Sequence, residues 1–157
     1  MKKLDEKRRL LELAIDHLEE LVSQLREESN ESLNGRDSTD EGGFSGNMGE
    51  FSSMAADSSR KDQALLRRGE ADRYAQMANV LRNYSIEEPM DKVGMLSMVV
   101  TNHGTFFISR AIKPLHMDGK TYYMIAPDAP IYGSMLGLRK GDKFSFRGID
   151  YAIEDVY

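Results

Sequence analysis

Carboxylates gathered in one stretch of the chain are the residues whose type and spacing could do chemistry. The stretch "GRDSTDEGGFSGNMGEF", residues 35–51, mixes acids with glycines and serines. Between Asn30 and Asp57 there are six acids and one base, against 26 acids and 21 bases in the whole chain. That leaves 20 of each elsewhere, so the net charge of -5 lies entirely in this segment. The segment is either a solvated acidic loop or a functional acidic surface. Its acids are Glu31, Asp37, Asp40, Glu41, Glu50 and Asp57.

Other kinds of catalytic or metal site find no support in the residue pattern. The absence of cysteine excludes disulfides, thiolate zinc sites and cysteine nucleophiles. His17, His103 and His116 have no partners at the spacing of metal ligands. No serine lies in a nucleophile elbow, and no phosphate-binding glycine loop precedes a helix. We therefore expect a protein that is not itself an enzyme and binds no metal ion alone.

Length and charge limit the class of protein. A chain of 157 residues has room for one domain, or for a small domain plus an extended element. No apolar run reaches the roughly 18 residues of a membrane helix, and the first residues are too charged for a signal peptide. We therefore expect a cytoplasmic protein without a membrane partner. The acidic pI of about 5.3 argues against binding duplex DNA through a basic surface.

Two stretches carry small or apolar residues at the seven-residue spacing of a coiled coil. The spacing is followed by Leu4, Leu11, Leu18 and Leu25 in the first stretch and by Ala64, Ala71 and Ala78 in the second. Small alanines opposite leucines let two helices approach closely. Because the connection between the stretches is short, we expect an antiparallel helical hairpin over residues 1–85. Helices packed on a globular core are the alternative, but little further apolar sequence is available to form that core.

The acidic segment, at about residues 30–57, would form the far tip of this hairpin. Between Ser29 and Ser53 there are few large apolar side chains to bury. The glycines at 42, 43, 46 and 49 each weaken a helix by about 1 kcal/mol relative to alanine. We therefore expect the acids to lie on the tip of a rod, far from the domain that anchors it.

From about residue 91 the pattern changes to short β-rich runs separated by turns, one of which is signalled by "MDGK" at residues 117–120. These runs are "MLSMVVT", "TFFISRA", "TYYMIA", "KFSF" and "IDYAIEDV". Between the third and fourth runs, "APIYGSMLGLRKGD" has a proline to begin a short helix and Gly137 to end it. The sequence thus predicts an α+β protein, whose second domain, residues 91–157, is a bent antiparallel sheet of about five strands with one helix on a face.

This second domain resembles the carboxy-terminal domain of the bacterial Gre transcript cleavage factors. The resemblance runs through "DKVGMLSMVV", "MDGKTYYMIAPDAPIYGSMLGLRKGDKFSF" and "IDYAIEDVY", and the spacing from Pro130 to Gly141 and Asp142 is its specific part. Met95 and Ala129 depart from the serines of the family pattern. The other matching positions are Val93, Gly94, Asp118, Gly119, Tyr123, Ile125, Leu136, Gly137, Tyr151 and Ile153.

The resemblance implies a fold and a mechanism. Gre factors dock an FKBP-like domain at the rim of the RNA polymerase secondary channel and insert the coiled coil. Two acids at its tip then help to hold a second Mg²⁺ at the polymerase active site, where water cleaves the backtracked transcript. Magnesium favours a few carboxylates together with waters and phosphate oxygens, so a factor need supply only one or two acids. The resemblance thus implies RNA polymerase as partner, indirect contact with backtracked RNA, and a Mg²⁺ shared with the polymerase.

The tip can be matched to the family pattern in two ways. One placement keeps an acid pair spaced by three at Asp37 and Asp40, with Glu41 beside it. The other matches Glu50 and Phe51 and leaves no acid pair, so that docking would survive while cleavage is lost. Asp37, Asp40 and Glu41 are our candidate functional acids, with Glu50 and Asp57 as second choices.

The candidate docking surface lies in "APIYGSMLGLRKGD", although its residues could simply shape the helix and turn. Its members are Pro130, Leu136, Gly137, Gly141 and Asp142. Three other functions stay open: a cleavage-inactive competitor of true cleavage factors, a coiled-coil adaptor, and an FKBP-like isomerase. An isomerase would need an aromatic pocket, for which the available rings are Phe106, Phe107, Tyr122 and Tyr123.

Overall fold

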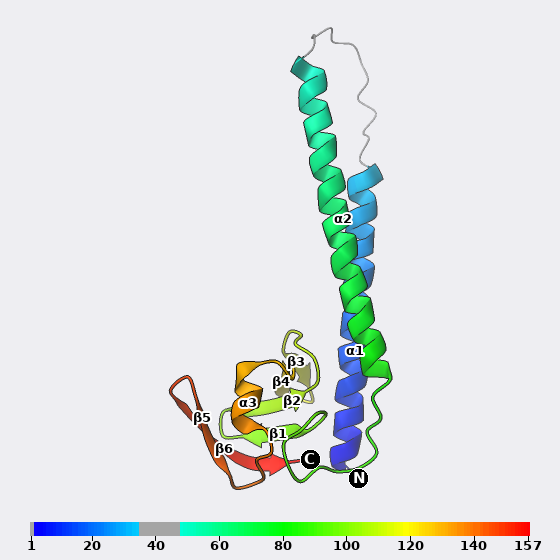
Figure 1. Cartoon of the computed structure of the whole chain (residues 1–157). Coiled ribbons are helices and arrows are strands. Elements are labelled where there is room, and N and C mark those ends of the chain that lie inside the picture. The colour runs from blue at the N-terminus through cyan, green and yellow to red at the C-terminus, as the bar shows by residue number, and fades with distance from the viewer. Residues whose placement is uncertain (1, 35–47) are drawn as a thin grey trace. The chain divides into compact units, whose positions relative to one another are not determined.

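The structure, a computed structural model, describes residues 2–34 and 48–157, and gives only the backbone for 48–53. It contains two long helices followed by strands and one short helix (Figure 1), which confirms the α+β prediction. The chain divides into two compact units. One takes in the chain up to Asp16 and from Val80 to Tyr157, and the other is His17–Asn79. The first half of the first helix therefore belongs with the sheet.

Helices α1 (Lys2–Asn34) and α2 (Met48–Arg82) form the predicted antiparallel hairpin. Within the His17–Asn79 unit, the Ser29 hydroxyl donates to the Ala64 carbonyl over 3.1 Å, and Arg26 pairs with Asp72 at 3.7 Å. As the residue number falls along α1, the number of the partner in α2 rises, so the two helices are antiparallel. Of the heptad residues in this unit, Leu18, Ala64, Ala71 and Ala78 are buried, as predicted, whereas Leu25 is only half-buried.

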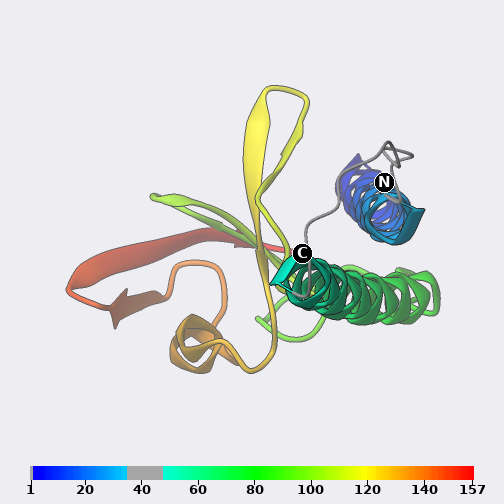
Figure 2. The same ribbon diagram turned by 90° about the horizontal axis from the view of Figure 1, so that it is seen from above.

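The sheet has six strands in the order β3-β4-β2-β1-β6-β5. Its strands are β1 (Met98–Thr101), β2 (Gly104–Ile108), β3 (Leu115–Met117), β4 (Lys120–Ile125), β5 (Lys143–Phe146) and β6 (Ile149–Val156). All neighbours pair antiparallel except β2 and β4, which are parallel. The parallel pair and the sixth strand arise because the short strand β3 turns the chain before β4 joins β2. Figure 2 shows the strong twist, with the yellow β3–β4 hairpin steeply inclined to the red β6.

One apolar core lies between the sheet and α3 (Pro130–Met135), which packs beside β5. Met135 is fully buried there, and the rings of Phe144 and Tyr151 stack with centroids 4.7 Å apart. The short helix begins with Pro130, as the sequence predicted. The helix covers this core, and the loop after α3 follows directly from the buried Met135. The core consists of Val93, Val99, Phe106, Ile108, Met135, Phe144, Tyr151, Ile153 and Val156.

Candidate functional site

The candidate acids of the tip are for the most part beyond what the structure describes. Asp37, Asp40 and Glu41 lie outside the described residues. The backbone of Glu50 is helical, in the first turn of α2. Asp57 is exposed on the same helix. The two placements of the family pattern on the tip therefore both stay open.

The five candidate docking residues come together in α3 and the loop that joins it to β5. Gly137 follows α3 with φ of 78°, and its N–H donates to the Val93 carbonyl over 2.9 Å. The Gly141 N–H donates to the Ile153 carbonyl over 2.8 Å. Asp142 accepts from the Arg139 N–H, also over 2.8 Å. These three residues thus fix the loop against its own unit.

Leu136 differs from its neighbours because its side chain is not used to hold the loop. It is 55% exposed, although it directly follows the buried Met135. Beside it, Arg139 pairs with Asp91 at 3.3 Å. The loop therefore presents one apolar side chain next to a salt bridge, and Leu136 is the docking candidate that offers a contact surface.

The sequence reasoning missed an arrangement at the base of α1. Glu6 accepts hydrogen bonds from the hydroxyls of Tyr122 and Tyr157, the latter over 2.9 Å. Burial first, and then this carboxylate, raises the pKa of Tyr122 and of Tyr157 above its ordinary value. The arrangement attaches the start of α1 to β4 and to the end of the chain. Nothing in the sequence around Glu6 signals it.

The predicted "DG" turn takes part in the same attachment. Asp118 and Gly119 have φ of 51° and 74°, so they form a tight two-residue turn between β3 and β4 with both central residues in the left-handed region. The Asp118 carboxylate also receives two hydrogen bonds from Arg9, over 2.9 and 3.1 Å. Asp118, a residue of the family pattern, therefore both shapes a turn and pairs with α1.

Lys7 is a second residue that the sequence reasoning did not identify. It follows Leu4 by three residues, on the face where the heptad spacing asks for an apolar side chain, and it is buried. Burial lowers the pKa of Lys7 from 10.5 to about 8. A lysine at a seam position was the available signal.

Three of the four aromatic residues considered for an isomerase pocket are buried in the fold. Phe106 and Phe107 are buried, and Tyr122 is buried with its hydroxyl on Glu6. Tyr123 is partly exposed and packs against Phe106, with ring centroids 5.7 Å apart. Among the side chains of residues 2–34 and 54–157, no three His, Asp or Glu are placed to hold a metal ion. In the same ranges, no helix is long and apolar enough to cross a membrane.

Comparison with solved structures gave remote likenesses, among them two structures of one transcription factor. No family model matches the sequence, and no curated protein matches it. The GreA factor homolog 1 (Gfh1) of Thermus thermophilus superimposes with a TM-score of 0.34 and 15% identity, covering 94% of each chain. A structure of the transcription factor Gfh1 gives a TM-score of 0.33 and 16% identity, covering 98% of this chain and 92% of that one. Both TM-scores lie below 0.5, so we draw nothing about function from either superposition.

Proposed function

We propose that this protein is a cytoplasmic RNA polymerase-binding elongation factor of the Gre type. Its carboxy-terminal unit would dock at the rim of the secondary channel, and the tip of its helical hairpin would enter the channel. It would not be an enzyme itself, because any cleavage would occur at the polymerase active site. The proposal rests on the sequence resemblance over residues 91–157 and on where the residues of that pattern lie.

The observation that carries the proposal is that the specific residues of the pattern occupy turns and helix ends whose backbone conformations require them. Asp118 and Gly119 form the two-residue turn between β3 and β4. Pro130 begins α3, and Gly137 ends it in the left-handed conformation that non-glycine residues avoid. If the resemblance were accidental, these residues would have no reason to adopt the backbone conformations for which Asp-Gly, proline and glycine are needed. The backbone conformations of these residues therefore support the resemblance to the Gre pattern.

The two helices have the length that an inserted element needs. α1 has 33 residues and α2 has 35, or about 50 Å each at 1.5 Å per residue. The segment with the acids connects their ends. Asp37 and Asp40, with Glu41, would supply carboxylates for a second Mg²⁺ shared with the polymerase and its backtracked RNA. If instead Glu50 occupies the place of the family acids, the protein would dock and compete with true cleavage factors without cleaving.

The decisive experiment uses backtracked elongation complexes made with the polymerase of the source organism. The protein is added over a range of Mg²⁺ concentrations, and the Asp37→Ala/Asp40→Ala and Glu50→Ala variants are tested in parallel. Transcript cleavage that disappears only with the double variant identifies a metal-assisting factor. Displacement of a cleavage factor without cleavage identifies a competitor. Absence of any binding to the polymerase refutes both versions.

A matched pair of variants tests the docking surface separately from the tip. Leu136→Ala removes the exposed apolar side chain of the docking loop, whereas Ile149→Ala removes one that is 45% exposed at the start of β6. We expect Leu136→Ala to weaken polymerase binding by about tenfold, as for one well-packed apolar contact. Ile149→Ala should leave it unchanged. Equal effects of the two variants would remove Leu136 from the interface.

A coiled-coil adaptor is the second candidate, and two side chains of α2 favour it. Leu65 and Leu66 are 64% and 74% exposed on the hairpin, outside its seam. An adaptor would lose partner binding with Leu65→Ala/Leu66→Ala and would be insensitive to the acids of the tip. A Gre-type factor would show the opposite dependence.

A further inference from the structure

Lys7 is a lysine whose burial has no compensating interaction. Its side chain is 1% exposed. Among the described residues no hydrogen bond or ion pair satisfies its ammonium group, and burial alone lowers its pKa. A buried charge is strongly unfavourable unless it is paired. The ammonium group is therefore available to pair with an anion.

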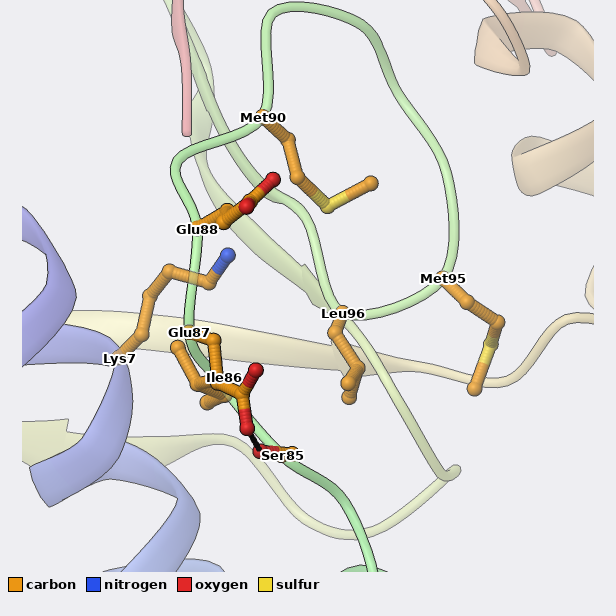
Figure 3. A pocket seen from close by; sticks show the side chains of 8 residues that line it. All are labelled: Lys7, Ser85, Ile86, Glu87, Glu88, Met90, Met95 and Leu96. Atoms are coloured by element: carbon orange, nitrogen blue, oxygen red, sulfur yellow. Dashed lines mark hydrogen bonds between the residues drawn. The ribbon is translucent and has the colours of Figure 1, made fainter.

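The ammonium group borders a cavity of about 320 Å³ in the carboxy-terminal unit. Figure 3 shows Lys7 reaching from α1 toward the loop of residues 85–96, which supplies the rest of the lining. The apolar part of this lining consists of Ile86, Met90, Met95 and Leu96. Methionine side chains are flexible and adapt to ligands of different shape. The cavity thus combines one cation with an apolar wall.

Two carboxylates of the same loop restrict what this cavity would accept. Glu87 and Glu88 are exposed at the cavity, and Glu87 already accepts a hydrogen bond from the Ser85 hydroxyl over 2.6 Å. Neither forms an ion pair with Lys7, and neither contributes to its lowered pKa. They would repel a multiply charged anion such as a phosphate ester. A single carboxylate would pair with Lys7 and leave their charges in water.

We propose that this cavity binds a small monocarboxylate with an apolar chain, whose carboxylate pairs with Lys7 and whose chain lies against Met90, Met95 and Leu96. The volume corresponds to roughly ten water molecules at about 30 Å³ each, so it suits a chain of about eight carbons. The site is separate from the docking loop and the tip. It stands whether or not the protein binds a polymerase.

The test uses the full chain with octanoate as the probe and 1-octanol as its neutral counterpart. Binding is followed by calorimetry and by the ε-methyl NMR signals of Met90 and Met95, with the exposed Met54 of α2 as internal reference. We expect saturable one-to-one binding of octanoate in the millimolar range or tighter, as for a ligand of about ten heavy atoms. The Met90 and Met95 signals should shift while that of Met54 does not. Octanol should bind about tenfold more weakly, because it lacks the charge that pairs with Lys7.

Two lysine variants separate this site from non-specific attraction. Lys7→Met keeps the length and packing of the side chain and should bind octanoate and octanol equally. Lys2→Met removes an exposed lysine of the same helix, one that lines a different cavity, and should behave as the wild type. Circular dichroism confirms that both variants fold. The proposal is overturned if octanoate does not saturate, if Lys7→Met keeps the preference for octanoate, or if Lys2→Met loses it.

Discussion

Glu6 and Lys7 are adjacent in the sequence but lie in opposite electrostatic situations. Glu6 is an acceptor for two phenols that are otherwise buried. Lys7 is buried beside a cavity, with no partner among the described residues. Two consecutive residues of one helix thus carry one charge that stabilises the fold and one that opposes it. The stability of the protein should therefore respond to these two residues in opposite directions.

Replacing Lys7 by methionine should stabilise the protein at pH 7. The lysine is charged in both the folded and unfolded states below pH 8, and the lowered pKa means that this charge destabilises the folded state. Above about pH 10.5 the amine is neutral in both states and the penalty vanishes. Since one pKa unit is worth about 1.4 kcal/mol, the shift from 10.5 to about 8 corresponds to a gain of about 3 kcal/mol at pH 7, which falls steadily between pH 8 and 10.5.

Urea denaturation of wild type and Lys7→Met across this pH range measures the gain as a difference. Ionisation of the tyrosines affects both proteins equally and cancels. A difference in unfolding free energy that stays constant from pH 7 to 10.5 would show that Lys7 has an ordinary pKa in the folded state.

Removing the carboxylate of Glu6 should destabilise the protein. Glu6→Ala leaves the buried hydroxyls of Tyr122 and Tyr157 without their acceptor, at about 1–3 kcal/mol for each unsatisfied group. We therefore expect a loss of about 2–4 kcal/mol in the free energy of unfolding, measured by urea denaturation. Glu12→Ala, at an exposed position of the same helix, should change it by less than about 0.5 kcal/mol. Equal effects of the two variants would show that Glu6 is not a structural acceptor.

At the scale of elements, the loop after α3 is defined by how the helix ends. Gly137 ends it with a positive φ, and the neighbouring residues are held by backbone hydrogen bonds to Val93 and Ile153. The exposed Leu136 lies next to this constrained glycine. The conformation of the loop, and with it the position of Leu136, should therefore depend on a glycine at 137.

Two alanine substitutions in and after α3 should have opposite signs. At Gly137 the φ of 78° makes alanine unfavourable by about 1–2 kcal/mol, although no atom lies within 4 Å of the added methyl group. At Gly133, inside the helix and equally open, alanine should stabilise by about 0.5–1 kcal/mol. Thermal unfolding measures both. Stabilisation by Gly137→Ala would mean that the residue is not held in the left-handed conformation.

At the scale of the molecule, the two compact units are stabilised by different kinds of packing. The hairpin unit, His17–Asn79, buries a narrow seam in which three of the buried residues are alanines. The unit with the sheet buries a core with three aromatic side chains, Phe106, Phe144 and Tyr151. Because apolar burial provides most of the stability of a fold, we expect the hairpin unit to open more readily.

Native-state hydrogen exchange measures this difference residue by residue. Backbone amides of α2 between Met54 and Asn79 should exchange faster than those of β1, β2 and β6. Protection should rise again at the base of α1, where Glu6 is bonded to Tyr122 and Tyr157. Uniform protection along both units would show that the protein unfolds in a single cooperative step.

The sequence by itself determined the elements, except the short strand β3, and much of the candidate docking loop. Seven-residue spacing identified the hairpin, and the "DG" turn, Pro130 and Gly137 marked where strands and the short helix begin and end. These features are local, since each follows from the conformations that a few neighbouring residues permit. The acids of the tip were also identified from composition, but Asp37, Asp40 and Glu41 lie outside the described residues, so their role stays a prediction.

Only the tertiary structure decided which distant residues meet. Glu6 lies 116 residues from Tyr122 and 151 from Tyr157, and no local pattern connects them. The parallel pairing of β2 with β4 and the burial of Lys7 beside a cavity likewise depend on how elements pack. Packing is set by the combined burial of many side chains, so a single sequence specifies the elements more directly than their contacts.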